Sequence, residues 1–236
     1  FDFVFDARGA ELGRGEKMES YSFKNVDFTY PEGEKKALRN ISFTVQQGEF
    51  VILCGPSGCG KSTTGRAILR LHEPTSGEVI FNGENILTKN KDEMRLLRRQ
   101  MQLIFQDPYS SLDPRKTVSQ IIAEPLIVNK IVDSKEAVEA RVNELMELVG
   151  IQQPHERYKL YPYNFSGGMR QRSVMAIALA SDPKILLADE PTGALDSETS
   201  LQIMELLKEI ARDKLVIMVT HDDIINKLDD AHIISL

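Results

Sequence analysis

One short segment of the sequence combines the residue types that bind phosphate. It follows the apolar run Phe50–Cys54 and fits the pattern G-x-x-x-x-G-K-[ST]. Its glycines let backbone N–H groups point inward at phosphate oxygens, and a helix that begins at Lys61 adds the partial positive charge of its N-terminus. We expect Lys61 to reach the outer phosphates of a nucleotide and the Ser62 hydroxyl to bind Mg²⁺. The residues predicted to line the phosphates are Gly55, Pro56, Ser57, Gly58, Cys59, Gly60, Lys61, Ser62 and Thr63.

A second apolar run ends in two carboxylates. Residues Lys184–Ala188 read KILLA, and Asp189 and Glu190 follow directly. Because α/β sheets bind ligands at the carboxyl ends of their parallel strands, we expect Asp189 to hold Mg²⁺ from the side opposite Ser62. Glu190, one residue further, is placed to polarise an attacking water. The alternative is that the pair is a solvent-exposed acidic start of a helix. This alternative is less favoured because the same chain carries the predicted phosphate-binding segment, residues 55–63, called the phosphate loop below.

The apolar runs of the sequence predict an α/β fold. Phe50–Cys54, Lys184–Ala188 and Leu215–Thr220 are short and continuous, as is typical of strands buried on both faces of a parallel sheet. An amphipathic helix is predicted between the last two runs, at Thr199–Ala211. A strand, a helix and a strand in this order make a right-handed βαβ unit.

The spacing of the two motifs predicts an insertion in this fold. Asp189 lies far beyond Lys61 in the chain, although one or two βα units span only about 30–60 residues. The segment from about residue 92 to residue 180 is mostly helical in pattern and is the candidate insertion. Residues 22–30 and 38–45 are expected to form a small antiparallel sheet. The predicted organisation is therefore an N-terminal extension (1–20, disordered or of artificial origin) and one domain (21–236), which consists of an α/β core (21–91 and 181–236) and an inserted helical subdomain (92–180).

Five further short motifs occur in the order of one protein family. From residue 22 to residue 236 the sequence resembles the nucleotide-binding subunit of ATP-binding cassette (ABC) transporters. The resemblance implies an α/β P-loop NTPase fold, with a RecA-like parallel-sheet core, an N-terminal antiparallel β subdomain and an inserted helical subdomain. It also implies an ATPase, with ATP and Mg²⁺ as cofactors. The motifs that carry it are Tyr30, Gln106, the signature segment Phe165–Met169, Ala194–Asp196 and His221.

The resemblance implies a role for each matching residue within one nucleotide site. Tyr30 is expected to stack on adenine, and Gln106 to contact both Mg²⁺ and the attacking water. His221 is expected to hold the γ-phosphate. Glu190 is expected to act as the general base, with Lys61, Gln106 and His221 completing the catalytic group.

The same resemblance implies that each site is shared between two subunits. Ser166, Gly167 and Gly168 precede a helix predicted over Arg170–Ala180, and such a loop offers backbone N–H groups to an anion. In the family that anion is the γ-phosphate bound to the other subunit, which Asp196 also faces. The implied active unit is a head-to-tail dimer, homomeric or heteromeric, with two ATP molecules at its interface.

The match to the family is imperfect in its details. Met169 stands where the family usually has Gln, so its side chain cannot make the hydrogen bonds of an amide. Residues 66–183 are similar to the oligopeptide/dipeptide importer branch, whereas residues 188–221 are similar to the macrolide-export and lipoprotein-release branch. This mixture fits either natural divergence or a recombined or engineered mosaic.

Composition narrows the function classes that remain. The chain has 236 residues and a formal charge of −6. This negative charge argues against a protein whose main function is to bind the phosphates of nucleic acid, because such proteins are usually basic. It has no apolar stretch near the roughly 20 residues of a membrane-spanning helix. Cys54 and Cys59 make no disulfide framework.

We therefore expect a cytoplasmic protein, peripheral on the inner face of the cell membrane, that powers transport through separate transmembrane permease subunits. No nucleic-acid partner is expected. Two alternatives are a soluble ABC ATPase that acts on nucleic acid and a mosaic that binds ATP without a cognate transporter.

Overall fold

The N-terminal part of the protein is an antiparallel sheet. The structure, a computed structural model, describes residues 20–31, 35–56, 58–220 and 231–236. In this sheet, with the strand order β2-β1-β4-β5, Phe23 lies opposite Phe43 and their rings stack with centroids 5.0 Å apart. The predicted antiparallel pair is confirmed, and two further strands extend it. The strands are β1 (Ser20–Thr29), β2 (Lys36–Gln46), β4 (Ser76–Phe81) and β5 (Glu84–Asn85).

A parallel sheet of five strands forms the centre of the molecule. Its order is β6-β7-β8-β3-β9, and every pairing of neighbours is parallel. The central strands β7 and β8 are buried along their whole length, and β3 is buried except at its last residue. The three strands predicted from continuous apolar runs are therefore confirmed. The five strands are β3 (Phe50–Cys54), β6 (Met101–Ile104), β7 (Ile185–Asp189), β8 (Leu215–Val219) and β9 (His232–Ser235).

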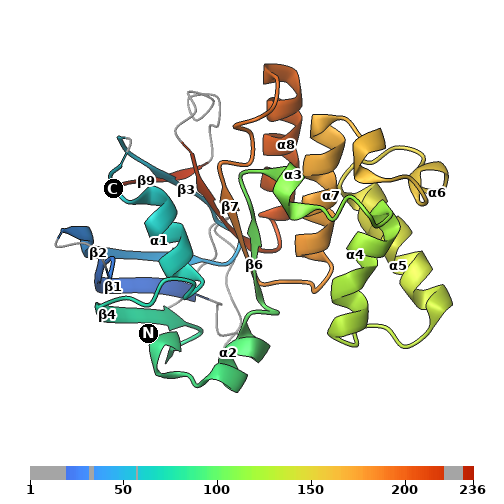
Figure 1. The fold of residues 1–236 in the computed structure, drawn as a ribbon. Helices are drawn as coiled ribbons and strands as arrows, with labels where there is room; N and C mark the ends of the chain where they lie inside the picture. The colour runs from blue at the N-terminus through green and yellow to red at the C-terminus, as the bar shows by residue number, and fades with distance from the viewer. Residues whose placement is uncertain (1–19, 32–34, 57, 221–230) are drawn as a thin grey trace, which may run out of the picture.

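Both faces of the parallel sheet are covered, by different parts of the chain. In β3, Phe50 and Ile52 point into one hydrophobic core, and Val51 and Leu53 point into the other. The first core contains residues of α4, α5, α7 and α8, and the second contains residues of α1 and the antiparallel sheet. Figure 1 shows the parallel strands between these two parts. Alternating side chains therefore serve two cores, which explains why these strands are apolar at every position.

Several helices begin at polar residues whose side chains cap them. Asn90 and Thr117 form capping boxes at α2 and α4, and Ser134 caps α5. Among the described residues, no helix is long and apolar enough to cross a membrane. The helices are α1 (Lys61–Ile68), α2 (Lys91–Leu97), α3 (Pro108–Ser111), α4 (Val118–Val128), α5 (Lys135–Leu148), α6 (Pro154–Arg157), α7 (Gly167–Leu179) and α8 (Ser197–Ile210), with 3₁₀ turns η1 (Ile86–Thr88) and η2 (Pro162–Asn164).

The predicted start of the helical insertion, at about residue 92, is wrong. Met101–Ile104 forms β6, which pairs in parallel with β7 and therefore belongs to the core sheet. The strand is short and lies at the edge of the sheet, where Gln102 and Leu103 stay partly exposed. It lacks the continuous apolar run of a doubly buried strand. The helical segment begins after β6, with α3.

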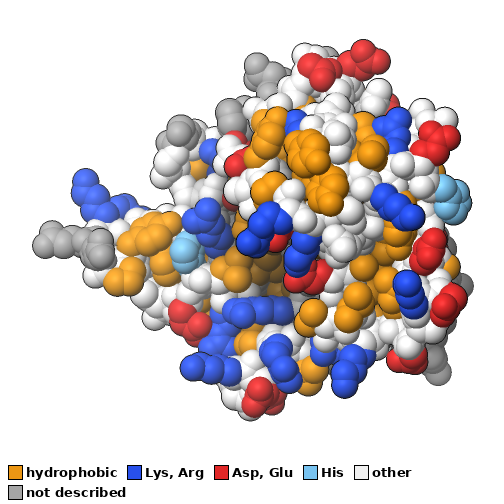
Figure 2. Space-filling view, turned by 45° about the vertical axis from the view of Figure 1, so that its right-hand side comes forward, with side chains coloured by type: hydrophobic (Ala, Val, Ile, Leu, Met, Phe, Trp, Pro, Cys, Tyr) orange, Lys and Arg blue, Asp and Glu red, His pale blue; other side chains and the backbone are white. Residues whose placement is uncertain are grey.

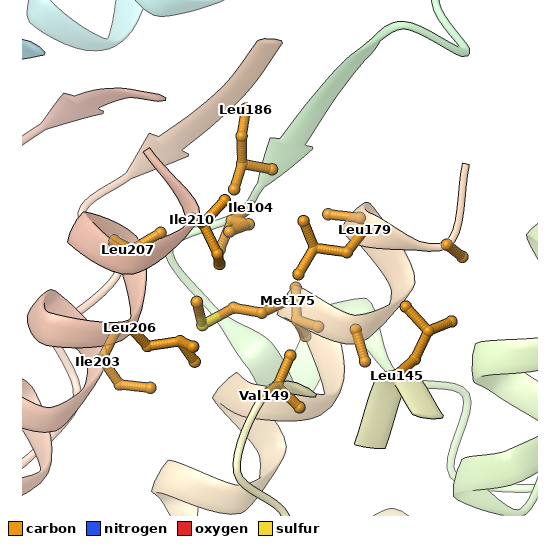
Figure 3. Close-up of a cluster of buried hydrophobic side chains, with 14 of the residues drawn as sticks. Ile104, Leu145, Val149, Met175, Leu179, Leu186, Ile203, Leu206, Leu207 and Ile210 are labelled. Atoms are coloured by element: carbon orange, nitrogen blue, oxygen red, sulfur yellow. The ribbon is translucent and has the colours of Figure 1, made fainter. Parts of the chain in front are cut away.

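The core on the helical side depends on side chains that α7 sends toward the sheet. Leu179 and Met175 lie among residues of α5, α8 and β7 (Figure 3) and are 2% and 0% exposed. We expect Leu179→Ala to lower the free energy of unfolding by about 2–5 kcal/mol, because truncation removes buried methyl groups and leaves a cavity. Urea unfolding followed by far-UV circular dichroism measures this change.

Leu148→Ala is the matched control, since Leu148 is also helical but 52% exposed. Its free energy of unfolding should change by no more than about 0.5 kcal/mol. Equal losses in the two variants would contradict the assignment of Leu179 to the core.

Candidate active site

Several of the predicted site residues lie together at the carboxyl edge of the parallel sheet. β3 leads into the phosphate loop, β6 leads to Gln106, and β7 ends at Asp189 with Glu190 next. Parallel strands present their carboxyl ends at one edge, so three segments far apart in the sequence meet there. A cavity of about 260 Å³ lies at this place, lined by Tyr30, Ala37, Gly58, Gly60, Lys61, Ser62, Thr63 and Glu190.

The phosphate loop curls around the ammonium group of Lys61. Lys61 Nζ donates hydrogen bonds to the carbonyl oxygens of Gly55 and Pro56, at 2.7 and 2.9 Å. Gly60 has φ 102°, and a Cβ there would lie 2.7 Å from the carbonyl oxygen of Ala37. Only glycine fits both the left-handed backbone and this close approach. The second glycine of the motif is thus required by the packing of the loop on β2.

The first turn of α1 is free of side-chain caps. Its N-cap residue is Gly60, and no side-chain hydrogen bond caps this end. Among the described helices of eight or more residues, the other four are capped by the side chains of Thr117, Ser134, Ser166 and Asp196. The uncapped N–H groups and the partial positive charge of α1 therefore point at the loop, as an anion requires.

Two of the three residues predicted to bind Mg²⁺ are in contact. Ser62 Oγ donates a hydrogen bond to Asp189 Oδ1 at 3.3 Å. Burial raises the pKa of the Asp189 carboxyl above its ordinary value, and the bond from Ser62 and the charge of Arg66 oppose that shift. Hydroxyl and carboxylate oxygens are the donors that Mg²⁺ prefers, so this pair fits the ion.

Gln106 and Glu190 form a second contact at the same edge. Gln106 Nε2 donates a hydrogen bond to Glu190 Oε2 at 2.7 Å. Glu190 adopts φ 47°, a left-handed conformation that costs a residue with a Cβ about 1–2 kcal/mol. Its N–H donates to the carbonyl oxygen of Val219 at 2.8 Å, which fixes this conformation against β8. Glu190 is among the residues that line the cavity beside the phosphate loop.

Tyr30 lies over the outer side of the phosphate loop. Its hydroxyl hydrogen bonds to Thr63 Oγ1 at 3.0 Å, and its side chain remains 42% exposed at the cavity. Ala37 also lines this cavity, although it was not among the predicted residues. A small apolar residue inside a strand carries no sequence signal for such a position.

The signature loop lies outside this cavity, on the other part of the molecule. Ser166 caps α7 by accepting a hydrogen bond from the N–H of Met169 at 3.3 Å. A Cβ at Gly168 would lie 2.5 Å from Cγ2 of Thr199, so the loop packs closely on the first turn of α8. Gly167 and Gly168 have their nearest described neighbours in Leu195 and Thr199, and no residue of Ser166–Gly168 is among the described residues that line the cavity.

Asp196 lies at the start of α8, beside the signature loop. It caps this helix, and its carboxylate accepts hydrogen bonds from the N–H and the hydroxyl of Thr199 at 2.9 and 2.7 Å. These bonds lower the pKa of Asp196 below its ordinary value. The structure thus brings two of the motifs expected to face a second subunit onto one surface.

The side chain of Met169 makes contacts that do not require the amide group of the Gln usual at this position. Arg157 Nη1 approaches Met169 Sδ to 2.9 Å, and Met169 packs partly buried against the core. The cap of α7 uses only the backbone N–H of Met169. The departure from the usual Gln therefore leaves the backbone of the signature loop intact. Two further predicted site residues, Ser57 and His221, lie outside the described residues.

Asp189 offers a test of this geometry that needs no ligand. Because burial raises its pKa, the folded state disfavours the ionised carboxylate, and this unfavourable contribution is present at pH values above the folded-state pKa. We expect Asp189→Asn, which keeps the oxygen that accepts from Ser62, to raise the thermal midpoint at neutral pH by about 2–4 °C per kcal/mol gained. Calorimetry without Mg²⁺ measures the midpoint.

The gain should shrink as the pH is lowered through the pKa of Asp189, because the wild-type carboxyl then becomes neutral. Asp133→Asn, at an exposed position, is the matched control and should change stability by no more than about 0.5 kcal/mol. A lower midpoint for Asp189→Asn at neutral pH would contradict the account.

Comparison with known proteins identifies the family of this chain. A family model described as ABC transporter matches residues 38–193. The oligopeptide transport ATP-binding protein OppF of Bacillus subtilis is 46% identical over 210 residues, which cover 88% of this chain and 68% of OppF. The glutathione import ATP-binding protein GsiA of Escherichia coli O157:H7 is 48% identical over 191 residues, which cover 80% of this chain but only 30% of GsiA.

The fold is also that of a solved cassette. A dimeric structure of a post-hydrolysis state of the ATP-binding cassette MJ0796, bound to ADP and Pi, superposes with a TM-score of 0.80 at 37% identity and covers 92% of this chain and 94% of that one. The similarity to OppF agrees with the predicted likeness to the oligopeptide importer branch. The fold, the arrangement at the sheet edge and these matches agree, and the chain belongs to the ABC transporter family as an ATP-binding cassette.

Proposed function

We propose that this chain binds ATP with Mg²⁺ and hydrolyses it to ADP and phosphate in order to power a membrane importer. The observation that carries the proposal is the pair of contacts beside the phosphate loop, from Ser62 to Asp189 and from Gln106 to Glu190. They place groups suited to Mg²⁺ and to an attacking water at one edge of the sheet. A transport ATP-binding protein and an import ATP-binding protein among the relatives support transport over an action on nucleic acid.

Different residues of the site bind different parts of the nucleotide. Tyr30 stacks on the adenine, and the loop N–H groups and Lys61 bind the phosphates. Ser62, Asp189 and the Gln106 amide are the groups that would hold Mg²⁺. When bound, the ion neutralises charge that develops on the phosphate oxygens. Lys61 and the N-terminus of α1 stabilise the same charge from the protein side.

Glu190 acts as the general base in this proposal. It orients a water for in-line attack on the γ-phosphorus and accepts a proton from it. The left-handed backbone holds the carboxylate at the cavity, and the hydrogen bond from Gln106 orients it. Catalysis is then mostly positioning and electrostatic stabilisation, with His221 contributing at the γ-phosphate.

The active form is a head-to-tail dimer. The loop Ser166–Gly168 packs beside α8, away from the described residues that line the cavity, and a second subunit placed head to tail would bring its own loop to that cavity. The dimeric cassette among the structural relatives supports this arrangement. Asp196, on the same surface as the signature loop, faces the partner's phosphate loop.

The partners in the membrane are separate permease subunits, and the transported class is short peptides, as the name of the OppF relative suggests. Exposed aromatic residues follow Gln106 and precede the signature loop, with Tyr109 64% and Tyr163 68% exposed. Tyr161 and Tyr163 stack at 5.4 Å, and Arg170 lies 4.0 Å over the ring of Tyr109. Figure 2 shows hydrophobic side chains gathered on this side of the molecule beside Lys and Arg. We assign this surface to the permease, which places the chain at the cytoplasmic face of the membrane.

The assignment of the base can be tested at one residue. Glu190→Gln keeps the size and the oxygen that accepts from Gln106 but cannot accept a proton. We expect phosphate release to fall by about 10²–10⁴-fold, while ATP affinity is kept and an ATP-bound dimer accumulates. Phosphate-release kinetics and gel filtration with ATP and Mg²⁺ measure both effects.

Glu147→Gln, at an exposed position of α5, should behave like the parent. Hydrolysis by Glu190→Gln at the parent rate would show that Glu190 is not the base.

The shared site predicts complementation between two inactive variants. Lys61→Ala removes the ammonium group that binds the phosphates in this proposal. Ser166→Asp keeps a residue that can cap α7 but places a negative charge toward the γ-phosphate. Dimers of either variant have two damaged sites, but a mixed dimer has one intact site. Mixing should therefore restore nucleotide occlusion, and hydrolysis with it, in radiolabelled-ATP trapping assays. No recovery on mixing two well-folded variants would favour sites contained within single chains.

A further inference from the structure

A histidine packs directly behind the aromatic residue at the nucleotide cavity. His72 lies in the loop after α1, where its backbone N–H donates to the carbonyl oxygen of Arg66 at 3.3 Å. Its ring is nearly parallel to that of Phe28, with centroids 5.1 Å apart and an interplanar angle of 18°. The ring of Tyr30 stands nearly perpendicular to both, at 5.5 Å from His72 and 4.9 Å from Phe28. The three rings form a cluster in which Phe28 is buried and Tyr30 reaches the cavity.

The cluster leaves Tyr30 little freedom to rotate. Two rings contact its side chain, and its hydroxyl is bonded to Thr63 Oγ1 at 3.0 Å. A ring held in one orientation before a ligand arrives avoids the entropy cost of ordering it on binding. Of its two ring supports, Phe28 belongs to the core of the antiparallel sheet, whereas His72 comes from a loop.

Among the described residues, the imidazole of His72 has no hydrogen-bonding role. Its Nε2 is buried and has no hydrogen-bond partner among them. Burial and the charge of Arg66 lower the pKa of His72, so the ring is neutral at physiological pH. A neutral, stacked ring with a buried and unpartnered nitrogen contributes through its shape and its ring contacts.

We propose that His72 is a positioning residue for the base of the nucleotide, which it serves by holding Tyr30 in the orientation that receives adenine. The inference rests on the proposed ATP-binding function and adds a residue that contacts neither the phosphates nor the reacting atoms. Loss of the His72 ring should therefore weaken binding of the base and spare binding of the phosphates. A residue that acted only on overall stability would weaken both.

The test compares a ligand with a base against one without it. Titration calorimetry of the purified chain with ATP·Mg²⁺ and with inorganic triphosphate·Mg²⁺ gives two dissociation constants for each variant. We expect His72→Leu, which keeps apolar bulk but removes the ring, to raise the ATP constant about three- to tenfold, the size of a lost aromatic contact. Its constant for triphosphate should stay within about twofold of the parent, since the phosphate loop is unchanged. His72→Phe restores a ring and should restore ATP affinity.

Tyr30→Ala separates the inference from the function on which it rests. If Tyr30→Ala loses ATP affinity while His72→Leu binds ATP like the parent, His72 is not a support, and the nucleotide site stands. Equal loss of ATP and triphosphate affinity in His72→Leu, or no rescue by His72→Phe, also overturns the inference. If the parent chain binds ATP no better than triphosphate, the adenine site at Tyr30 itself is wrong, and the inference falls with it.

Discussion

The burial of both faces of the parallel sheet is the constraint on which the rest of the molecule depends. Side chains of β3, β7 and β8 alternate between two cores, so neither face has room for a ligand. The backbone groups inside the sheet pair with neighbouring strands, and only the strand ends remain open. Polar residues can then gather at low cost only at the edges, and the carboxyl edge holds Gln106, Asp189 and Glu190 beside the phosphate loop.

Residues at this edge adopt environments and conformations that are unfavourable in the absence of a ligand. Asp189 is buried enough to raise its pKa, and Glu190 holds a left-handed backbone. The first turn of α1 has no side-chain cap, unlike the other long helices among the described residues. The buried carboxylate and the uncapped helix start cost stability in the ligand-free chain, and a bound cation and phosphate group would offset these two costs. The stable cores on either side of the sheet offset these costs.

The central strands and the phosphate loop were predictable from the sequence, whereas the edges of the sheet were not. A strand buried on both faces needs apolar residues at every position, as in FVILC, and few other segments show that pattern. The edge strands β6 and β9 have four residues each and are only partly buried, so their apolar residues are few and are interrupted or flanked by polar ones. Motif matching likewise identified Gln106 and Glu190, but their hydrogen bond depends on the pairing of β6 with β7. Ala37 and His72 reach the site through tertiary packing alone, which no local pattern records.

The phosphate loop and the signature loop are separated by the same packing that builds the fold. Gly168 lies so close to Thr199 that the signature loop is packed against the first turn of α8. Helix α8 in turn packs on the face of the sheet opposite α1. The loop therefore cannot swing toward its own phosphate loop without breaking the core between α7 and α8. A second chain can reach the open carboxyl edge without disturbing either core. In the proposed dimer, the sheet that positions the phosphate loop of a chain also keeps that chain's signature loop on its helical side, so the partner's loop would supply the second half of the site.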